Sequence, residues 1–454
     1  MTGLARIFED APSAEAFSDA AFLAAMLAFE GALARACAAA GLVSGEDASA
    51  IARVCAGAQF DVGALAQAAR ESGALPIPFV RELTAQVAAV SPAAARQVHL
   101  GATSQDVIDT ASVLCLRAAG ERLLALTDRL GDALSERAHA HAATPMLART
   151  LLQPAVPVPF GWKVAGWLAG LARARGACAQ ALGAACVLQF GGAGGTLAAY
   201  GAQGEAVAQA LAADLGLPRA PVSWHAMRDG FARAGAELAI LTGVVGKVAR
   251  DVALMMQAEV GEAFEPLAPG RGGSSAMPHK RNPAACLLAL EAAGRVPGLA
   301  ATLIGQLASE HERGLGQWQR QWLLLGELAA ACGSALEAMA GVIEGLQVDA
   351  DAMRRNIDRT NGLVYSEQLA VRLAPRLGKP AAHALVEALC AEAVAGNRPL
   401  HAVATGSAQV REVFDAAGLA QVFEPTEAFG SAGAMIERAR AAWAQVRRAP
   451  SWTE

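Results

Sequence analysis

The feature that most constrains this chain is a proline-free stretch of almost forty residues that starts at Ser104 and keeps a helical pattern of apolar residues. Ser104 is a good N-cap residue and Asp106 would lie in the first turn, so we expect a long helix to begin there. Further long helices are expected to begin near Phe160, near Arg228, after Pro283 and near Trp318. Helices of about 30 residues exceed the globular average, so several of them together predict an elongated helical bundle.

Alanine is abundant, aromatic residues make up only 5% of the chain, and hydrophobic residues make up 54%. Because alanine is the strongest helix former, we predict an all-α protein with closely packed helices. The apolar content exceeds what one bundle can bury, which favours a homo-oligomer. We expect a helical N-terminal domain over residues 1–100, a central long-helix bundle over 101–345 and a C-terminal domain of shorter helices over 346–454.

The formal net charge of −5 argues against nucleic acid or an anionic membrane as a partner. Acidic residues stand near the start where a secretory signal would need an apolar segment, and the longest uncharged run, 176–204, is interrupted by GGAGG. We therefore expect a cytoplasmic protein. The eight cysteines form no CxxC pair and lie mostly in apolar helical runs, so we expect them to be buried and reduced.

Four polar stretches interrupt the helices, and the first is HLGATSQD at 99–106. It places Thr103 and Ser104 at a helix N-terminus, where backbone N–H groups and hydroxyls can hold a carboxylate. Simple helix capping would explain the same two residues.

The second stretch, ARTLLQPA at 148–155, offers the polar side chains of Arg149, Thr150 and Gln153. A plain loop between helices would also account for it, so the residues alone do not separate the two interpretations.

The third stretch comprises LQFGGAGGTL at 188–197 and SWHAMRD at 223–229. Its glycines suggest a phosphate loop, but it has neither a GK[ST] element nor a preceding strand pattern, so we expect a turn or close helix packing instead. His225 and Arg228 are a weak candidate pair, because a histidine near a helix start is more often a hydrogen-bonded structural residue than a catalyst.

The fourth stretch, GRGGSSAMPHKRNP at 270–283, is a basic, flexible segment between helices. It provides backbone freedom, hydroxyls and an anion-binding pair: Gly272, Gly273, Ser274, Ser275, Lys280 and Asn282. That combination suits a lid that closes over a carboxylate substrate, although an ordinary surface loop has the same composition. No residue cluster has the spacing of a zinc, iron–sulfur or calcium site, so we expect no metal.

The fourth stretch resembles the signature loop of the fumarase/aspartase superfamily, and HLGATSQD and ARTLLQPA are similar to that family's first two site segments. The resemblance implies an all-α homotetramer in which segments from three subunits meet at each active site. It also implies the chemistry: a base removes a proton next to a carboxylate, an aci-carboxylate forms, and a group leaves the β-carbon. No cofactor is implied.

The resemblance also assigns roles to individual residues. Ser274 would be the catalytic base, Lys280 and Asn282 would bind one substrate carboxylate, and Thr103 and Ser104 would bind another. The remaining predicted substrate-binding residues are Arg149, Thr150, Gln153, His225, Arg228, Ser275 and Met277.

The sequence departs from the family pattern at two positions. Leu151 stands where the family's lyases usually have a histidine, and Leu287 stands where they have the glutamate that pairs with it. Ammonia, amines and hydroxide need a proton donor to leave, but a carboxylate does not, since its conjugate acid has a pKa of about 4. The two leucines therefore favour a reaction in which a carboxylate leaves or, in reverse, adds to a double bond to form a lactone.

One branch of the superfamily, the bacterial 3-carboxy-cis,cis-muconate cycloisomerases of protocatechuate breakdown, performs such a lactonisation. Five elements of this chain resemble that branch: VHLGATSQD, LQFGGAGGTLAA, SWHAMRD, GGSSAMPHKRNP and EHERGLGQW. The implied substrate is a small tricarboxylate, which suits the local cations Arg149, Arg228, Lys280 and Arg281. The alternatives are an adenylosuccinate lyase or another fumarate-releasing lyase, and a non-catalytic protein similar to some lens crystallins.

Overall fold

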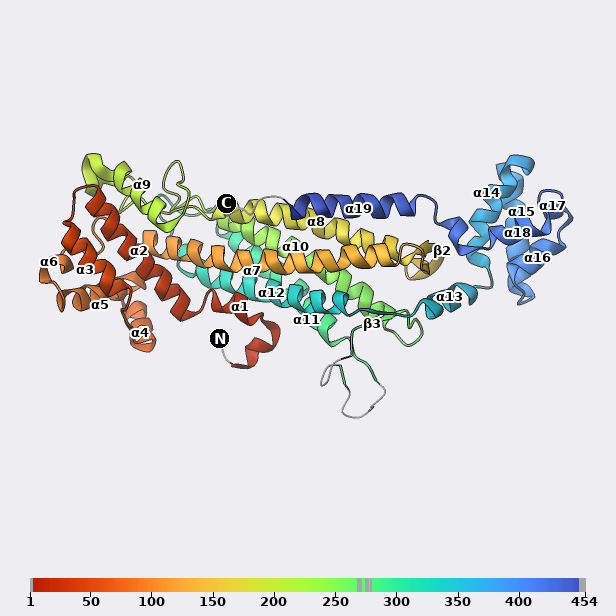
Figure 1. Ribbon diagram of the computed structural model, residues 1–454, viewed down its shortest axis with the longest axis horizontal. Coiled ribbons are helices and arrows are strands. Elements are labelled where there is room, and N and C mark those ends of the chain that lie inside the picture. Colours follow the sequence, from red (N-terminus) through yellow and green to blue (C-terminus); the bar gives the residue numbers. More distant parts are fainter. Residues whose placement is uncertain (1–2, 268–271, 274–276, 278–279, 449–454) are drawn as a thin grey trace.

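The computed structural model describes residues 3–267, 272–273, 277 and 280–448, and it shows an elongated helical bundle with a smaller helical unit at each end (Figure 1). The five expected long helices are all present. They are α7 (Ser104–Ala140), α8 (Phe160–Ala185), α10 (Asp229–Met255), α11 (Ala284–Gly305) and α12 (Gln321–Glu344), with the short η3 (Trp318–Arg320) before α12. The all-α prediction is confirmed.

The start of α7 differs by one residue from the expectation. Thr103, not Ser104, is the N-cap, with an extended backbone of φ −125° and ψ 160°. The backbone N–H of Thr103 donates to the Asp106 carboxylate at 3.0 Å, which forms one half of a capping box. Ser104 is therefore the first helical residue, and its hydroxyl stands at the N-terminal end of a helix of 37 residues, which is about 55 Å long.

One end of the molecule is built from the N-terminal helices together with a segment that follows α8. Its elements are η1 (Gly3–Phe8), α1 (Ala11–Glu15), α2 (Asp19–Ala39), α3 (Gly45–Cys55), α4 (Val62–Ser72), α5 (Pro76–Ala88), α6 (Pro92–Ala95), η2 (Ala198–Gln203) and α9 (Gly204–Leu215). Helix α9 packs against α2 (Figure 1). The loop 186–197 thereby lies close to the start of α7.

The other end has its own small core. Its elements are α13 (Ala350–Asp358), η4 (Leu363–Tyr365), α14 (Ser366–Leu377), α15 (Lys379–Ala395), α16 (Leu400–Gly406), α17 (Ala408–Arg411), α18 (Ala416–Val422) and η5 (Pro425–Ala428). Buried apolar side chains from α14 to α18, such as Leu369, Leu400 and Val422, form this core.

The last helix, α19 (Ala432–Arg447), returns to the bundle and packs along α8 (Figure 1). The expected boundary at 346 groups this helix with the C-terminal domain, but the side chains of Ile436 and Trp443 lie in the main core. The Trp443 ring covers Gly131 of α7, where any Cβ would collide with it. The Trp443 Nε1–H also donates to Asp132 at 2.8 Å, so α19 is fixed to the bundle by packing and by a polar contact.

Two small antiparallel sheets were not expected from the sequence. Strands β1 (Pro145–Thr150) and β2 (Gln153–Pro159) form a hairpin that pairs Thr150 with Gln153. The two turn residues, Leu151 and Leu152, both have positive φ angles, 51° and 65°, as a tight two-residue hairpin turn requires. The predicted plain loop at 148–155 is thus a rigid hairpin. In a second antiparallel pair, β3 (Ala263–Phe264), which lies just before the signature loop in the sequence, pairs with β4 (Gln347–Val348), which follows α12.

The eight cysteines behave as expected. Seven are buried, Cys390 is half-buried, and all are free thiols. Burial raises the pKa of the Cys115 thiol to about 12, which keeps it protonated and inert.

Three described helical segments are long and apolar enough to cross a membrane by length and composition: Asp19–Ala39, Ala284–Gly305 and Trp318–Glu344. The first and third are 67% and 83% buried within the fold, but α11 is only 28% buried. A long, apolar face of α11 is therefore uncovered in the single chain.

Candidate active site

Asp106 is the centre of a buried hydrogen-bond network at the start of α7. Its side chain is fully buried and accepts hydrogen bonds from the first stretch and from both parts of the third. The donors are the backbone N–H groups of Thr103 (3.0 Å), Gly191 (3.0 Å) and Gly192 (2.9 Å), the His225 ring through Nε2 (2.8 Å) and the Gln189 side-chain amide (3.4 Å). Asp106 therefore fixes the position of the first stretch relative to both parts of the third.

Gly191 and Gly192 belong to the glycine-rich segment, which forms a turn and not a phosphate loop. Gly192 has a φ of 68°, and a Cβ at Gly192 would lie 2.9 Å from the carbonyl oxygen of Gly101. Glycine is required there because the two loops approach backbone to backbone. The sequence predicted a turn or close packing for this stretch, and the structure contains a closely packed turn.

Arg228, the N-cap residue of α10, is bound to a second buried acid, Asp109, which lies about one helical turn beyond Asp106 on α7. Its guanidinium forms two parallel hydrogen bonds with Asp109, at 2.7 and 2.8 Å, and its Nε–H donates to Gln321 at 2.6 Å. The guanidinium also lies over the Trp224 and Phe231 rings, 5.3 and 5.4 Å from their centroids. Arg228 is only 3% exposed, so this geometry uses its charge to stabilise the fold, and contact with substrate stays a prediction.

His225 is similarly held inside the protein. It is 4% exposed, and its Nε2 contact to Asp106 and the hydrogen bond that its carbonyl accepts from Gln105 (2.8 Å) orient it. The interpretation that the sequence favours, a hydrogen-bonded structural histidine near a helix start, therefore describes its position well. Its predicted substrate contact also stays a prediction.

Arg313 is a polar site residue that the sequence did not single out. It lies in the loop between α11 and η3, and its Nη1–H donates to the Thr103 hydroxyl at 3.0 Å. Nη2 donates to the carbonyl oxygens of Ala193 (3.1 Å) and Gly192 (3.4 Å), whereas Nε is buried and has no hydrogen-bond partner among the residues described. EHERGLGQW was recognised as an element, but nothing in its pattern shows that its arginine folds onto the start of α7, more than 200 residues earlier in the chain.

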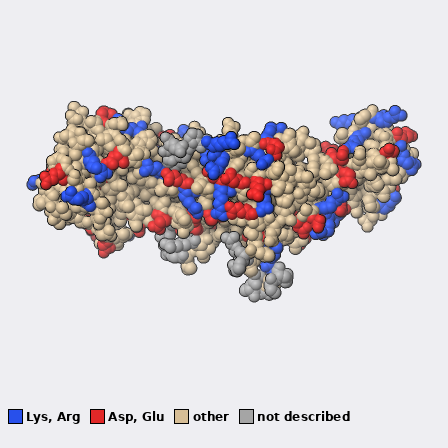
Figure 2. Space-filling model, in the orientation of Figure 1, with Lys and Arg blue, Asp and Glu red and all other residues tan. Residues whose placement is uncertain are grey.

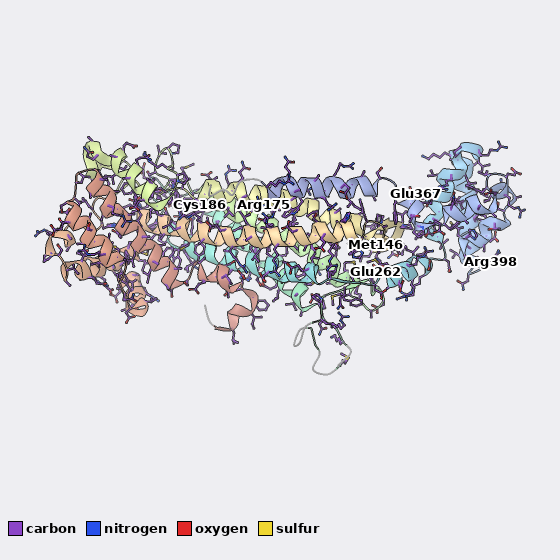
Figure 3. The ribbon with its side chains drawn as sticks, in the orientation of Figure 1. Met146, Arg175, Cys186, Glu262, Glu367 and Arg398 are labelled. Carbon is purple, nitrogen blue, oxygen red and sulfur yellow. The ribbon has the colours of Figure 1, made fainter. Side chains whose placement is uncertain are left out.

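The hairpin residues lie at the opposite end of the bundle. Arg149, Thr150 and Gln153 follow the C-terminal end of α7, whereas Thr103 and Ser104 stand at its beginning, so the length of α7 separates them. Figure 3 shows this separation, with Met146 and Glu262 toward one end and Cys186 toward the other. A single chain therefore does not bring the first and second stretches together.

Arg149 is paired with a buried carboxylate in the hairpin region. Its two Nη groups donate to Glu262 at 2.8 and 2.6 Å, and Glu262 also accepts a hydrogen bond from Asn356 at 2.8 Å. The Glu262 side chain is fully buried, so Arg149 neutralises a charge that would otherwise be costly. The side chain of Arg149 keeps 27% exposure, which leaves part of it open to a ligand.

The signature loop lies between β3 and α11, and part of it can be placed. Ser274, Ser275 and His279 fall outside the described residues. Asn282 donates its backbone N–H to the carbonyl of Gly272 at 2.9 Å, and Gly272 has a φ of 65°. These contacts close the base of the loop.

The end of this loop is anchored to α11 by Glu265 and Arg281. The Glu265 carboxylate accepts the N–H groups of Ala285 (3.1 Å) and Cys286 (2.8 Å) at the start of α11. Arg281 donates to the Glu265 carbonyl at 3.0 Å and lies 4.7 Å from the centroid of the Phe264 ring. Arg281 thus has a structural function here.

The cations expected around the substrate are therefore not equivalent. Arg149, Arg228 and Arg281 are engaged within the chain, whereas Lys280 is exposed and its ammonium makes no hydrogen bond or ion pair with any residue that the structure describes. Figure 2 shows acidic and basic side chains interspersed along the visible face. Lys280 is thus an accessible cation, whereas Arg313 is half-buried and is bonded to the neutral oxygens of Thr103, Gly192 and Ala193.

The two leucines that replace the family's acid pair lie on different elements. Leu151 is 97% exposed at the tip of the hairpin, and Leu287 is 55% exposed in the first turn of α11. In the single chain both side chains are open to solvent, as residues at a subunit interface would be.

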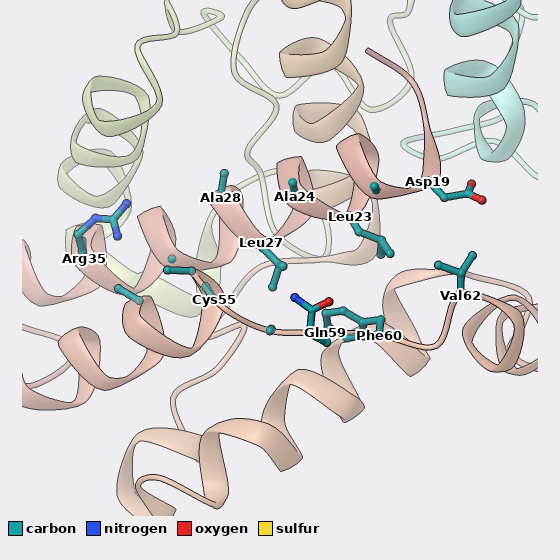
Figure 4. A pocket seen from close by; sticks show the side chains of 15 residues that line it. Asp19, Leu23, Ala24, Leu27, Ala28, Arg35, Cys55, Gln59, Phe60 and Val62 are labelled. Carbon is teal, nitrogen blue, oxygen red and sulfur yellow. The ribbon is translucent and has the colours of Figure 1, made fainter. Parts of the chain in front are cut away.

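A groove of about 760 Å³ beside α2 and α3 contains none of the predicted site residues (Figure 4). It is lined mostly by small and apolar side chains, including Leu27, Cys55 and Phe60. Within the described ranges, no group of three or more His, Cys, Asp or Glu side chains is placed to hold a metal ion.

Comparison with known proteins identifies the family. The family described as Lyase matches residues 8–298, and Adenylosuccinate lyase C-terminus matches residues 362–439. A 3-carboxy-cis,cis-muconate cycloisomerase from Bradyrhizobium diazoefficiens is 47% identical over 435 residues, 96% of each chain. A nitrosuccinate lyase from Streptomyces davaonensis is 43% identical over 436 residues, 94% of this chain and 92% of that protein.

A solved structure agrees with these matches. The crystal structure of 3-carboxy-cis,cis-muconate lactonizing enzyme from Pseudomonas putida has a TM-score of 0.92 to this chain at 42% identity, and the match covers 97% of this chain and 98% of that one. The resemblance noted in the sequence is confirmed: the chain belongs to the fumarase/aspartase superfamily of lyases.

Proposed function

We propose that this enzyme is a 3-carboxy-cis,cis-muconate cycloisomerase that forms 4-carboxymuconolactone in protocatechuate degradation, the β-ketoadipate pathway. The observation that carries the proposal is the match to cycloisomerases along almost the whole chain, at 47% identity. The replacement of the family's acid pair by Leu151 and Leu287 supports it independently, because a reaction with a carboxylate as leaving or entering group needs no acid there.

In the lactonising direction, one carboxylate oxygen of the substrate forms a bond to the β-carbon of its own double bond. The π electrons move to the α-carbon and its carboxylate, which becomes an aci-carboxylate dianion. The Ser274 hydroxyl then gives a proton to the α-carbon, and solvent returns a proton to the serine. In the reverse direction the deprotonated Ser274 is the base.

The developing dianion has to be stabilised by fixed donors and cations. Thr103 and Ser104 offer hydroxyls and backbone dipole at the start of α7, where Arg313 adds a positive charge within 3.0 Å of the Thr103 hydroxyl. Lys280 and Asn282 serve a second carboxylate. A substrate with three carboxylates needs several such anion-binding groups. The proposed chemistry involves no metal.

The site is completed between subunits of a cytoplasmic homotetramer. Thr103 and Arg149 lie near opposite ends of α7, a helix about 55 Å long, so one chain alone does not bring the two residues together. The weakly buried apolar face of α11 supplies a surface for association.

Nitrosuccinate is the strongest competing substrate, because a lyase for it is 43% identical to this chain. Nitrite is also a stable anion, so its departure would equally require no acid. Adenylosuccinate and other amine-releasing substrates fit less well, since the two leucines provide no proton donor. A non-catalytic role would leave the exposed Lys280 and the organised start of α7 without a purpose.

A substrate panel separates these functions. The purified protein is incubated with 3-carboxy-cis,cis-muconate, nitrosuccinate, adenylosuccinate, argininosuccinate, fumarate or aspartate, and ultraviolet absorbance, nitrite and ammonia are measured. We expect loss of the diene absorbance of the muconate, with or without a chelator. Faster release of nitrite or an amine from another substrate would contradict the proposal, and loss of activity with the chelator would contradict the metal-free mechanism.

A further inference from the structure

Glu30 is a buried carboxylate outside every stretch considered so far. It lies on α2, its side chain is fully buried, and its Oε1 is 2.6 Å from the His99 Nδ1. Its second oxygen, Oε2, has no hydrogen-bond partner in the part of the chain that the structure describes. A buried, ionised carboxylate is costly unless a positive charge faces it, and the His99 ring is the group in contact.

Neither neighbouring thiol can neutralise this carboxylate. Burial, and then the Glu30 charge, raises the pKa of Cys37 to about 11 and that of Cys55 to about 12. Both thiols are therefore neutral at physiological pH. The Tyr200 hydroxyl is also neutral, since burial raises its pKa, and it donates to the carbonyl of Leu100 at 2.5 Å.

His99 stands at the beginning of the loop that leads to Thr103 and Ser104. Its backbone is in the left-handed region with a φ of 59°, which is unfavourable for a residue with a Cβ. The side chain keeps 17% exposure, and the Nε2 atom has no partner among the described residues. The contact with Glu30 thus orients a ring whose other nitrogen is available to a ligand at the start of α7.

We propose that Glu30 is a positioning residue that holds His99 as an imidazolium, which adds a positive charge to the carboxylate-binding start of α7. The proposal deepens the proposed function and rests on it. The groups that face His99 are Glu30 from α2 and Asp106 from α7, both acidic, with the neutral Tyr200 from η2 bound to the next residue of the loop. The surroundings therefore favour the charged ring.

The direction of the pH effect follows from these neighbours. Burial alone would lower the pKa of His99, but the charge and hydrogen bond of Glu30, with the Asp106 charge, together raise it above the ordinary 6.5. The imidazolium is present below this raised pKa and is lost as the pH rises through it. Substrate affinity should fall over the same pH range, because the cation that faces the substrate disappears.

Glu30→Gln tests the proposal, because glutamine keeps a hydrogen-bond acceptor but removes the charge. His99 is followed by NMR in protein labelled with ¹³C at histidine Cε1, with His99→Gln identifying its signal. Steady-state kinetics with 3-carboxy-cis,cis-muconate are measured across the same pH range. Glu46→Gln, an exposed glutamate in the first turn of α3, is the matched control.

We expect His99 to titrate at lower pH in Glu30→Gln than in the wild type. The increase of KM with rising pH should shift to lower pH by the same amount. At neutral pH KM should increase about tenfold or more, the loss of one charge-assisted contact, with a smaller effect on kcat. An unchanged His99 titration would refute the ion pair. A shifted titration with an unchanged KM profile would refute the role at the substrate site. A wild-type protein that does not consume the muconate would refute the proposed function, and the titration would still decide whether Glu30 holds His99 charged.

Discussion

Replacing Asp106 by asparagine should destabilise the protein strongly, although the two side chains have almost the same shape. The Oδ1 atom of Asp106 faces the His225 ring, the N–H of Gly191 and the Gln189 side-chain amide. The Oδ2 atom faces the N–H groups of Thr103 and Gly192. An asparagine has one acceptor oxygen, so its NH₂ group must face at least two donors, whichever way it is turned.

The magnitude follows from that count. Each buried donor that loses its acceptor costs about 1–3 kcal/mol, so two of them cost about 2–6 kcal/mol in the free energy of unfolding. This is a large part of the total for a typical protein, about 5–15 kcal/mol. The variant should also bind substrate poorly, since the Thr103 N–H is one of the two donors on the Oδ2 side.

Urea unfolding followed by circular dichroism, at one protein concentration, measures the change as a lower midpoint with an unchanged slope. The matched control is Asp229→Asn, which removes an exposed first-turn aspartate of α10 whose side chain is 56% exposed and pairs with Arg233 at 3.3 Å. The control should lose less than about 1 kcal/mol. Equal losses for the two variants would show that Asp106 is not the centre of the network.

Three further predictions concern the base, a buried ion pair and the assembly. Ser274→Ala should lower kcat by several orders of magnitude, and a variant within about tenfold of wild type would exclude Ser274 as the base. Arg228→Met should cost about 3–5 kcal/mol of stability because the buried Asp109 loses the cation that it pairs with. The double variant Arg228→Met/Asp109→Leu should recover most of that loss in urea unfolding, and no recovery would argue against the pair. Analytical ultracentrifugation should show a tetramer, whereas a fully active monomer would contradict a site shared between subunits.

The long helices were predictable because their information is local. Uninterrupted apolar periodicity without proline marked α7, and prolines marked the helix starts near Phe160 and after Pro283. The one-residue error at the start of α7 arose because Thr103 and Ser104 are both good capping residues, and only the Thr103 contact to Asp106 decides between them.

The hairpin and the partners of the arginines were not predictable, since they depend on contacts between distant residues. Prolines in β2 obscure any alternating strand pattern, and two leucines with positive φ are unusual turn residues. Arg228 is cationic in the sequence, but Asp109, 119 residues away, determines what its charge does. The same holds for Arg313 and Thr103, which are 210 residues apart.

The replacement of the family's histidine and glutamate by Leu151 and Leu287 also depends on contacts between residues that are distant in the sequence. In the family pattern, a histidine and a glutamate from these positions meet at the site, although in this chain the two leucines lie on a hairpin tip and on α11. Removing one member of a desolvated charged pair leaves the other uncompensated, which costs about 3–5 kcal/mol, whereas two apolar side chains can pack in their place. If the reaction needs no acid, the histidine and the glutamate have no functional role at these positions. Because one of them alone would be an uncompensated charge, the loss of one favours the loss of the other. Both leucines are exposed in the single chain, so that packing would need another copy of the chain, which the proposed site between subunits would supply.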